Sequence, residues 1–287
     1  MFDIYLLEAV INGVLLGGVL ALLALGLNLI FGVIDVVWIC YAELIMLGMY
    51  GMYYLYAVFH LPYLLAALIS IAGVGGLGML LHILVIAPLL GAAPINQLLA
   101  TGGVLFFLQS FATVAFGIDF RNLGIRLPVL AISDMYISYA RLLACGAALG
   151  GMVLLYLFLA RTYTGAAIRA IAQDRQIMPL MGVDTRRIYL ITSLIGGALA
   201  GLAACLLVLQ YDIQPFIGLT FGPITFMICV LGGLGNMVGG FLAAFIFAQI
   251  ISISGLYLDL EWGYVFAFVF FIVMMFVRPR GLMARRS

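Results

Sequence analysis

Long apolar runs follow one another along almost the whole chain, and they restrict its possible folds more than any other feature. About 20 apolar residues are enough to cross the hydrocarbon core of a bilayer as an α-helix. Several runs reach that length and some are interrupted, so we expect an all-α membrane bundle of eight or nine segments. The runs cover residues 5–33, 36–59, 62–86, 95–117, 139–160, 188–209, 218–233, 238–255 and 262–277.

Charged residues are scarce in this chain. They make up 8% of its 287 residues, whereas soluble domains average about 25%. A chain with so little polar surface would not stay dissolved as a compact body. We therefore expect residues 1–287 to form one transmembrane domain surrounded by lipid, and we expect no nucleic-acid partner.

The chain has no lysine, and all twelve of its basic residues are arginine. A Walker A phosphate loop needs a lysine, so the chain cannot hydrolyse ATP by that route. No HExxH, GxSxG or plausible Cys–His pair is present, and the four cysteines show no CxxC spacing. We therefore expect no catalytic residue, no metal site and no cofactor.

The arginines are concentrated in two places. Nine of the twelve lie in the loop 161–187 or after residue 277. Arginine and lysine are enriched in cytoplasmic loops near helix ends, so we expect this loop and the C-terminus to be cytoplasmic. Five apolar runs precede residue 161, which places the N-terminus and the region 118–138 outside.

Two short stretches of the sequence are similar to each other. Leu15–Leu27 and Leu194–Leu206 share eight of thirteen residues without a gap. The predicted topology runs them in opposite directions, as in the inverted repeats of many transporters. The alternative is chance, because leucine, glycine and alanine dominate membrane helices. The stretch 207–226 contains Pro215 and Pro223, and we expect it to be a broken helix.

Glu43 is the most deeply placed charge within the apolar runs. A charge near the bilayer centre costs about 3 kcal/mol on insertion scales, so it usually faces a cavity or a partner. Glu43 could line a polar pathway or bond a neighbouring helix. Asp35 stands near a predicted helix end, and Gln109 is interpreted as a helix–helix hydrogen bond.

The loop 161–187 contains a stretch, "TGAAIRAIAQDRQIM", with the pattern of an amphipathic helix. Its apolar side would carry Ala167, Ile168, Ile171 and Met178, and its charged residues Arg169, Asp174 and Arg175 would face water or a partner. A solvated loop would explain the charges but not this alternation.

Continued to "GAAIRAIAQDRQIMPLMGVDTRRIYLITSLIGGALAGLAACL", this region resembles the coupling loop and following helix of the branched-chain amino-acid permease (Liv) family. The segments "VLGGLGNMVGGFLAA", "FVRPRGL" and "GVLLGGVLALLALGLNLIFGVIDVV" are similar to the same family. The resemblance extends over essentially the whole chain. Members of the family are membrane subunits of ABC importers.

The resemblance implies a function, a location and partners. The chain would move branched-chain or related small amino acids by ATP-driven alternating access in a bacterial-type inner membrane. It would work with two cytoplasmic ATPase subunits, a second permease that is homologous or identical, and an external solute-binding protein. The family's coupling loop docks on the ATPase, and the matching residues here are Ala172, Gln173, Asp174, Arg175 and Gly182.

The sequence departs from the family pattern in two places. The family's Asn-Phe-Ala-His-Gly-Glu is replaced by Trp38-Ile39-Cys40-Tyr41-Ala42-Glu43, and we place Trp38, Tyr41 and Glu43 near the solute pathway. Pro179 stands where small helix formers are usual, and we expect it to end the coupling helix early.

Two other classes of function remain open from the sequence. A self-sufficient secondary transporter or channel for a small polar solute would need its own coupling site, for which Glu43 as a proton carrier is the candidate. A membrane scaffold without transport is the other class, and it predicts that Arg175→Ala leaves solute uptake in cells unchanged.

Overall fold

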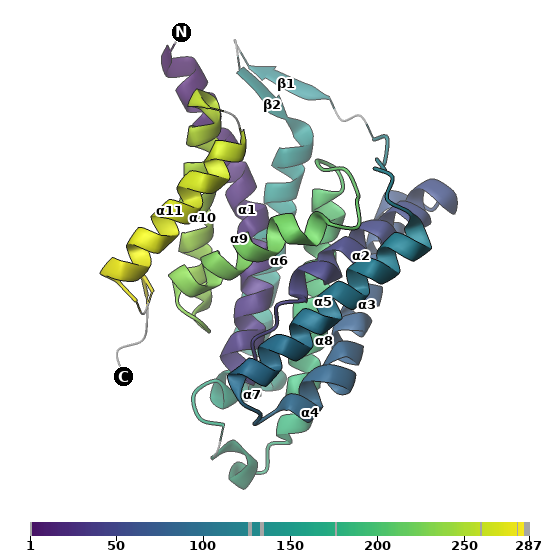
Figure 1. Cartoon of the computed structure of the whole chain (residues 1–287), viewed down its shortest axis with the longest axis vertical. Coiled ribbons are helices and arrows are strands. Elements are labelled where there is room, and N and C mark those ends of the chain that lie inside the picture. Colours follow the sequence, from purple (N-terminus) through teal and green to yellow (C-terminus); the bar gives the residue numbers. More distant parts are fainter. Residues whose placement is uncertain are drawn as a thin grey trace.

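The computed structural model describes residues 2–125, 128–132, 135–175, 177–258, 260–279 and 281–283. The chain forms a helical bundle (Figure 1), which confirms the predicted membrane fold. Its helices are α1 (Phe2–Ile34), α2 (Tyr41–Tyr53), α3 (Tyr63–Leu81), α4 (Ala87–Leu89), α5 (Pro94–Phe116), α6 (Tyr139–Arg161), α7 (Tyr163–Ile171), α8 (Thr185–Leu207), α9 (Ile217–Gly232), α10 (Met237–Tyr257) and α11 (Leu260–Val277). Two π-helical turns, η1 (Tyr54–Val58) and η2 (His82–Ile86), and a 3-10 turn, η3 (Met178–Met181), complete the helical elements.

Each of the nine apolar runs contains a helix. Among the residues that the structure describes, six helical stretches are long and apolar enough to cross a membrane: Tyr5–Ile34, Tyr63–Leu89, Pro94–Phe116, Tyr139–Arg161, Thr185–Leu207 and Met237–Tyr257. The apolar parts of α9 and α11 are shorter. The second run differs most from its predicted bounds, because residues 35–40 are not helical and α2 begins only at Tyr41.

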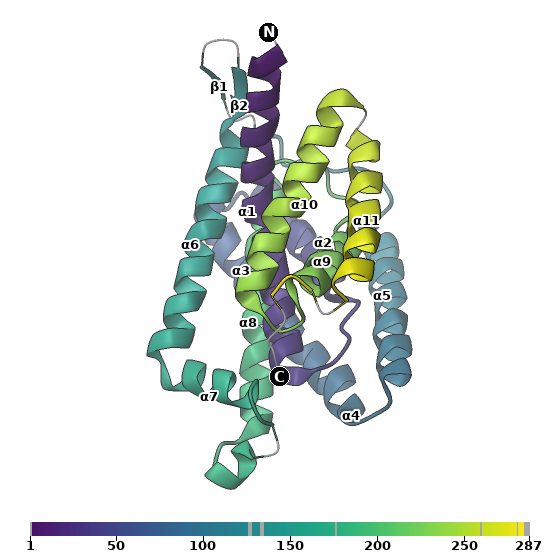
Figure 2. The same ribbon diagram turned by 90° about the vertical axis from the view of Figure 1, so that its left-hand side faces the viewer.

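Two antiparallel helix pairs form the most extensive packing in the bundle, α1 on α10 and α3 on α8 (Figure 2). Glycines allow both close approaches. A side chain at Gly13 or Gly17 of α1 would meet α10, and one at Gly197 or Gly201 of α8 would meet α3. Close approach at small residues is the usual way that helices pack in lipid.

Each of the two helix pairs also joins the N-terminal half of the chain to the C-terminal half. The first long helix of the N-terminal half, α1, packs on α10, and the first long helix of the C-terminal half, α8, packs on α3. A non-helical stretch follows α1 and another follows α8, and each leads into one of the short helices α2 and α9. This is the arrangement that an inverted repeat predicts.

The stretch 207–226 is broken, as its prolines predict. Helix α8 ends at Leu207 and α9 begins at Ile217, with Pro215 in the connection between them. Pro223 lies inside α9 and does not interrupt it. A second break separates α9 from α10 at residues 233–236, where Gly233 and Gly235 have φ angles of 99° and 79°.

The connection between α5 and α6 carries the two strands of the described chain, a feature that the sequence did not predict. Strands β1 (Val129–Ile132) and β2 (Met135–Ser138) form an antiparallel hairpin. The hairpin lies at the same end of the bundle as the start of α1, while α7 lies at the opposite end (Figures 1 and 2). Arg126, Asp134, Arg280, Arg285 and Arg286 lie outside the described residues.

Candidate functional site

An apolar cavity of about 340 Å³ lies where α2 begins. The non-helical stretch 37–39, the first residues of α2, helix α5 and helix α9 form its walls. Thr225 is the one lining side chain with a hydroxyl apart from Tyr41. The lining residues are Leu27, Val37, Trp38, Ile39, Tyr41, Ala42, Leu98, Leu105, Gly218, Leu219, Gly222, Pro223, Thr225 and Phe226.

Trp38 and Tyr41, both placed near the pathway from the sequence, line this cavity and are each 1% exposed. The polar atoms of both side chains are bonded within the protein. Trp38 Nε1 donates to Cys40 Sγ at 2.9 Å, and the Tyr41 hydroxyl donates to the Gly196 carbonyl of α8 at 3.1 Å. The cavity therefore receives mainly the apolar surfaces of these two rings.

Glu43 is fully buried beside the cavity. Its Oε1 accepts a hydrogen bond from Gln109 Nε2 of α5 at 2.9 Å, which confirms the predicted helix–helix bond of Gln109. Among the described residues, none donates to Glu43 Oε2. The carboxyl group packs directly on Gly218 of α9, where an added Cβ would have no room. Gly218 also lines the cavity, so this residue lies between the Glu43 carboxyl group and the cavity.

Two helix N-termini meet at this point. Glu43 is in the first turn of α2, and Gly218 is in the first turn of α9. The N-terminus of a helix carries a partial positive charge, which favours a carboxylate nearby. No local pattern in the sequence pairs Gly218 with Glu43, because the two residues lie far apart along the chain.

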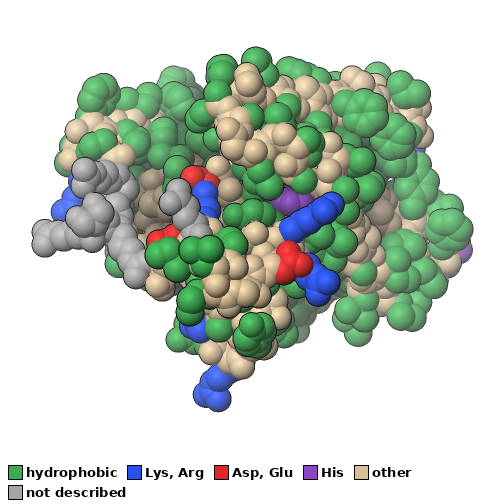
Figure 3. Space-filling view, turned by 90° about the horizontal axis from the view of Figure 1, so that it is seen from below, with side chains coloured by type: hydrophobic (Ala, Val, Ile, Leu, Met, Phe, Trp, Pro, Cys, Tyr) green, Lys and Arg blue, Asp and Glu red, His purple; other side chains and the backbone are tan. Residues whose placement is uncertain are grey.

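A second and more polar cleft, of about 860 Å³, opens at the α7 end of the bundle. It lies between the last turns of α1, helix α7 with the turn after it, and the connection from α9 to α10. Seen from this end, charged side chains gather in the middle of a largely hydrophobic outline (Figure 3). Asp35, Arg169, Gln173 and Arg175 are among the lining residues.

Helix α7 has the amphipathic character that its sequence predicts. Ala167, Ile168 and Ile171 are buried against the bundle, and Met178 packs on the core from the following turn. The Thr162 hydroxyl caps the helix by accepting from the Gly165 backbone N–H at 3.0 Å. The buried face fixes the position of the loop 161–187 relative to the bundle.

The prediction that Pro179 ends this helix is wrong. Helix α7 already ends at Ile171, and Pro179 lies at the start of the 3-10 turn η3. Asp174 Oδ1 accepts from the Ile177 backbone N–H at 3.1 Å and so begins a separate turn. Such side-chain bonds to the backbone compete with a continuing helix.

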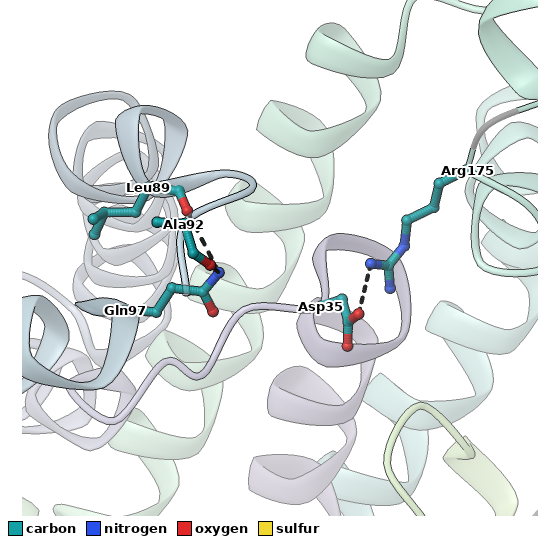
Figure 4. Close-up of polar contacts among 5 residues, drawn as sticks. All are labelled: Asp35, Leu89, Ala92, Gln97 and Arg175. Atoms are coloured by element: carbon teal, nitrogen blue, oxygen red, sulfur yellow. Dashed lines mark hydrogen bonds and ion pairs between the residues drawn. The ribbon is translucent and has the colours of Figure 1, made fainter. Parts of the chain in front are cut away.

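The residues matched to the coupling motif lie on the turns after α7. Ala172, Gln173 and Asp174 are exposed, and Gly182 is exposed with a φ angle of 81° at the end of η3. Apolar side chains are exposed beside them: Ile177, Leu180 and Met181 are 53%, 84% and 73% exposed. Arg175 instead forms an ion pair with Asp35, 2.9 Å between Nη1 and Oδ2 (Figure 4).

Comparison with known proteins decides the family. A family profile described as "Branched-chain amino acid transport system / permease component" matches residues 9–276. The chain belongs to this permease family. Members are permease subunits of ABC transport systems and are not themselves catalytic, which confirms the resemblance and the expectation that this subunit is not an enzyme.

Individual permeases are similar over almost their full length. The high-affinity branched-chain amino acid transport system permease protein LivH of Escherichia coli K12 is 26% identical over 98% of this chain and 96% of its own length. The corresponding protein BraD of Pseudomonas aeruginosa is 29% identical over 97% and 96%. The chain is thus a multi-pass membrane protein homologous to bacterial inner-membrane permeases.

The fold is also similar to a solved structure. PsaBC from Streptococcus pneumoniae, solved in complex with Fab, superposes with a TM-score of 0.53 at 13% identity. The match covers 94% of this chain and 91% of that one.

As a permease of an ABC system, the chain works with an ATPase and a binding protein.

Proposed function

We propose that this permease forms half of the pathway by which an ABC importer takes up branched-chain or related small amino acids. The apolar cavity at the start of α2 carries the proposal. Its volume of about 340 Å³ falls within the range of small-molecule sites, about 300–1,000 Å³. Trp38 and Tyr41 would contact the apolar side chain of the solute, and Glu43 would lie next to the pathway.

The residues 172–182 would bind the ATPase. They combine exposed polar groups with the exposed apolar side chains of Ile177, Leu180 and Met181 at one end of the bundle. Exposed apolar residues surrounded by polar ones are typical of protein–protein contacts. In the complete importer, two ATPase subunits and a second permease, similar or identical, would join this chain, and an external binding protein would deliver the solute.

The distribution of the arginines supports one orientation in the membrane. The loop 161–187 and the C-terminus would be cytoplasmic, and the N-terminus and the hairpin would be external. An introduced cysteine at Leu180, which is 84% exposed, tests this. A membrane-impermeant thiol reagent should label Leu180→Cys in inside-out vesicles and not in intact cells, while the four native cysteines are buried. Labelling in intact cells would reverse the orientation.

The function is tested by reconstitution. The chain is purified with the ATPase, second permease and binding protein encoded beside it, and placed in liposomes with labelled leucine, isoleucine and valine outside. ATP inside should drive accumulation that a non-hydrolysable ATP analogue does not support. Uptake driven by a proton gradient without ATP, and lost in Glu43→Gln, would instead establish a secondary transporter. If the chain purified without any ATPase and the liposomes took up no solute, a membrane scaffold without transport would be the remaining interpretation.

A further inference from the structure

Asp35 occupies an unusual backbone position immediately after α1. Its φ angle is 58°, in the left-handed region, and its N–H donates to the Phe31 carbonyl at 3.0 Å. Aspartate and asparagine adopt this conformation more readily than other residues with a side chain. The chain turns here from α1 into the stretch that leads to the cavity.

The side chain of Asp35 reaches across to the loop after α7. Its Oδ2 lies 2.9 Å from Arg175 Nη1, as Figure 4 shows. The two side chains are 73% and 34% exposed, and an exposed pair of this kind adds little to the stability of a fold. What the pair does provide is a direct contact between the end of α1 and the proposed ATPase-binding segment.

The same stretch of chain forms the cavity wall. Val37, Trp38 and Ile39 line the cavity, and they follow Asp35 by two to four residues. The Val37 carbonyl lies 3.0 Å from the Thr101 hydroxyl of α5. One turn earlier on α5, Gln97 Nε2 donates to the Ala92 carbonyl at 3.2 Å and so ties down the start of that helix (Figure 4).

The residues 35–40 therefore contact the loop at one point, through Asp35 and Arg175, and α5 at another, through Val37 and Thr101. A helix resists bending because each of its residues is bonded to the next turn, whereas residues 36–40 are not helical and form no such ladder among themselves. Movement of the loop relative to α5 would consequently change the shape of this stretch before it changed any helix.

We propose that Asp35 is a positioning residue for transport: its pair with Arg175 transmits displacement of the residues 172–182 to the cavity wall at 37–39. The inference rests on the proposed function, since it assumes that the ATPase moves that segment. It assigns to Arg175 a contact inside this chain, in addition to the contact with the ATPase that the sequence resemblance implies.

The test measures the number of solute molecules imported per ATP hydrolysed by the reconstituted importer. Asp35→Gly removes the carboxylate and tolerates the left-handed backbone. Arg175→Gln removes the other partner. An exposed ion pair can bias an equilibrium by at most about fivefold, so each variant should lower the ratio measurably, by up to about fivefold. The double variant should be no worse than either single variant, because both remove one connection.

Arg187→Gln is the matched control. Arg187 also forms an ion pair in the loop, with Asp184 at 2.9 Å, and the side chains of both residues are exposed. Its removal leaves the helix cap in place, because the backbone N–H of residue 187 can still donate to Asp184 Oδ1. The control should keep the wild-type ratio, and all variants should retain the ATPase on purification.

Three results would overturn the inference: a wild-type ratio in Asp35→Gly, losses that add up in the double variant, or an equal loss in Arg187→Gln. Should Asp35→Gly fail to assemble, Asp35→Asn keeps the shape of the side chain without its charge and decides the question in the same assay. Failure of the wild-type importer to use ATP at all would contradict the proposed function instead, and so the two failures are distinguishable.

Discussion

The cavity at the start of α2 and the loop after α7 are built on opposite principles. Around the cavity, Trp38 and Tyr41 are 1% exposed and their polar atoms are bonded inside the protein. On the loop, Leu180 is 84% exposed and leaves its apolar surface uncovered. The residues around the cavity therefore hold the fold together, whereas the exposed residues of the loop are available to a partner.

Trp38→Ala should give the largest effect of the changes considered. Removing a fully buried tryptophan costs about 3–5 kcal/mol, because a cavity remains. We expect a clear fall in the thermal unfolding midpoint of the purified importer and loss of uptake. Unfolding followed by light scattering in mild detergent measures the first effect. A midpoint equal to that of wild type would mean that Trp38 is not a packing residue.

Gly218→Ala should come next. A Cβ at this position has no room beside the Glu43 carboxyl group, and overpacking of this kind costs about 1–3 kcal/mol. Gly222→Ala on the same helix should cost less than Gly218→Ala, since its Cβ would meet only the Ala42 Cβ, at 3.1 Å. Gly146→Ala, with nothing within 4 Å of the added carbon, should not destabilise the protein. Equal midpoints for Gly218→Ala and Gly146→Ala would contradict the packing described.

Glu43→Ala should lower stability by about 1–3 kcal/mol, because the buried Gln109 amide loses its acceptor. Glu43→Gln retains an oxygen that can accept from Gln109 Nε2 and should therefore stay close to the wild-type midpoint. Comparison of the two midpoints separates the hydrogen bond from the charge. If the glutamine variant were as unstable as the alanine variant, the charge itself would stabilise this site.

Leu180→Ala should have the smallest effect on stability, within about 0.5 kcal/mol, as is usual for an exposed side chain. Its effect should appear in assembly, as reduced recovery of the ATPase on purification through a tag on this chain. Leu154→Ala is a suitable control, because Leu154 is also exposed, at 71%, but lies on α6. If both variants recovered the same amount of ATPase, the exposed surface of the loop would not be part of the ATPase contact.

Much of the fold could be predicted from the sequence. The nine apolar runs all contain helices, since a segment in lipid must satisfy its own backbone hydrogen bonds. The amphipathic face of α7 and the break before α9 could also be predicted from their residues. The start of α2 could not, because residues 36–40 are as apolar as the helix that follows them. The β-hairpin was missed because its strands are short and no strong turn signal separates them in the sequence.

The candidate site was harder to predict. Trp38, Tyr41 and Glu43 stand out in the sequence because they replace or retain family residues, and the structure places the first two on the cavity and the third beside it. Gly218, Gln109 and Thr101 complete the surroundings of the cavity and of residues 37–39 from two other helices. Their distance along the chain from residues 37–43 leaves no local pattern that would link them.

The sequence by itself determined that this chain crosses a membrane many times and that it lacks the lysine of a phosphate loop. It also determined that the loop 161–187 is richer in charged residues than the rest of the chain. These properties depend on composition and on short-range periodicity, which any one segment carries alone. Only the tertiary structure decided that Glu43 meets Gly218 and that Asp35 meets Arg175. Those contacts join residues more than 100 positions apart, and they depend on how whole helices pack, which no single segment encodes.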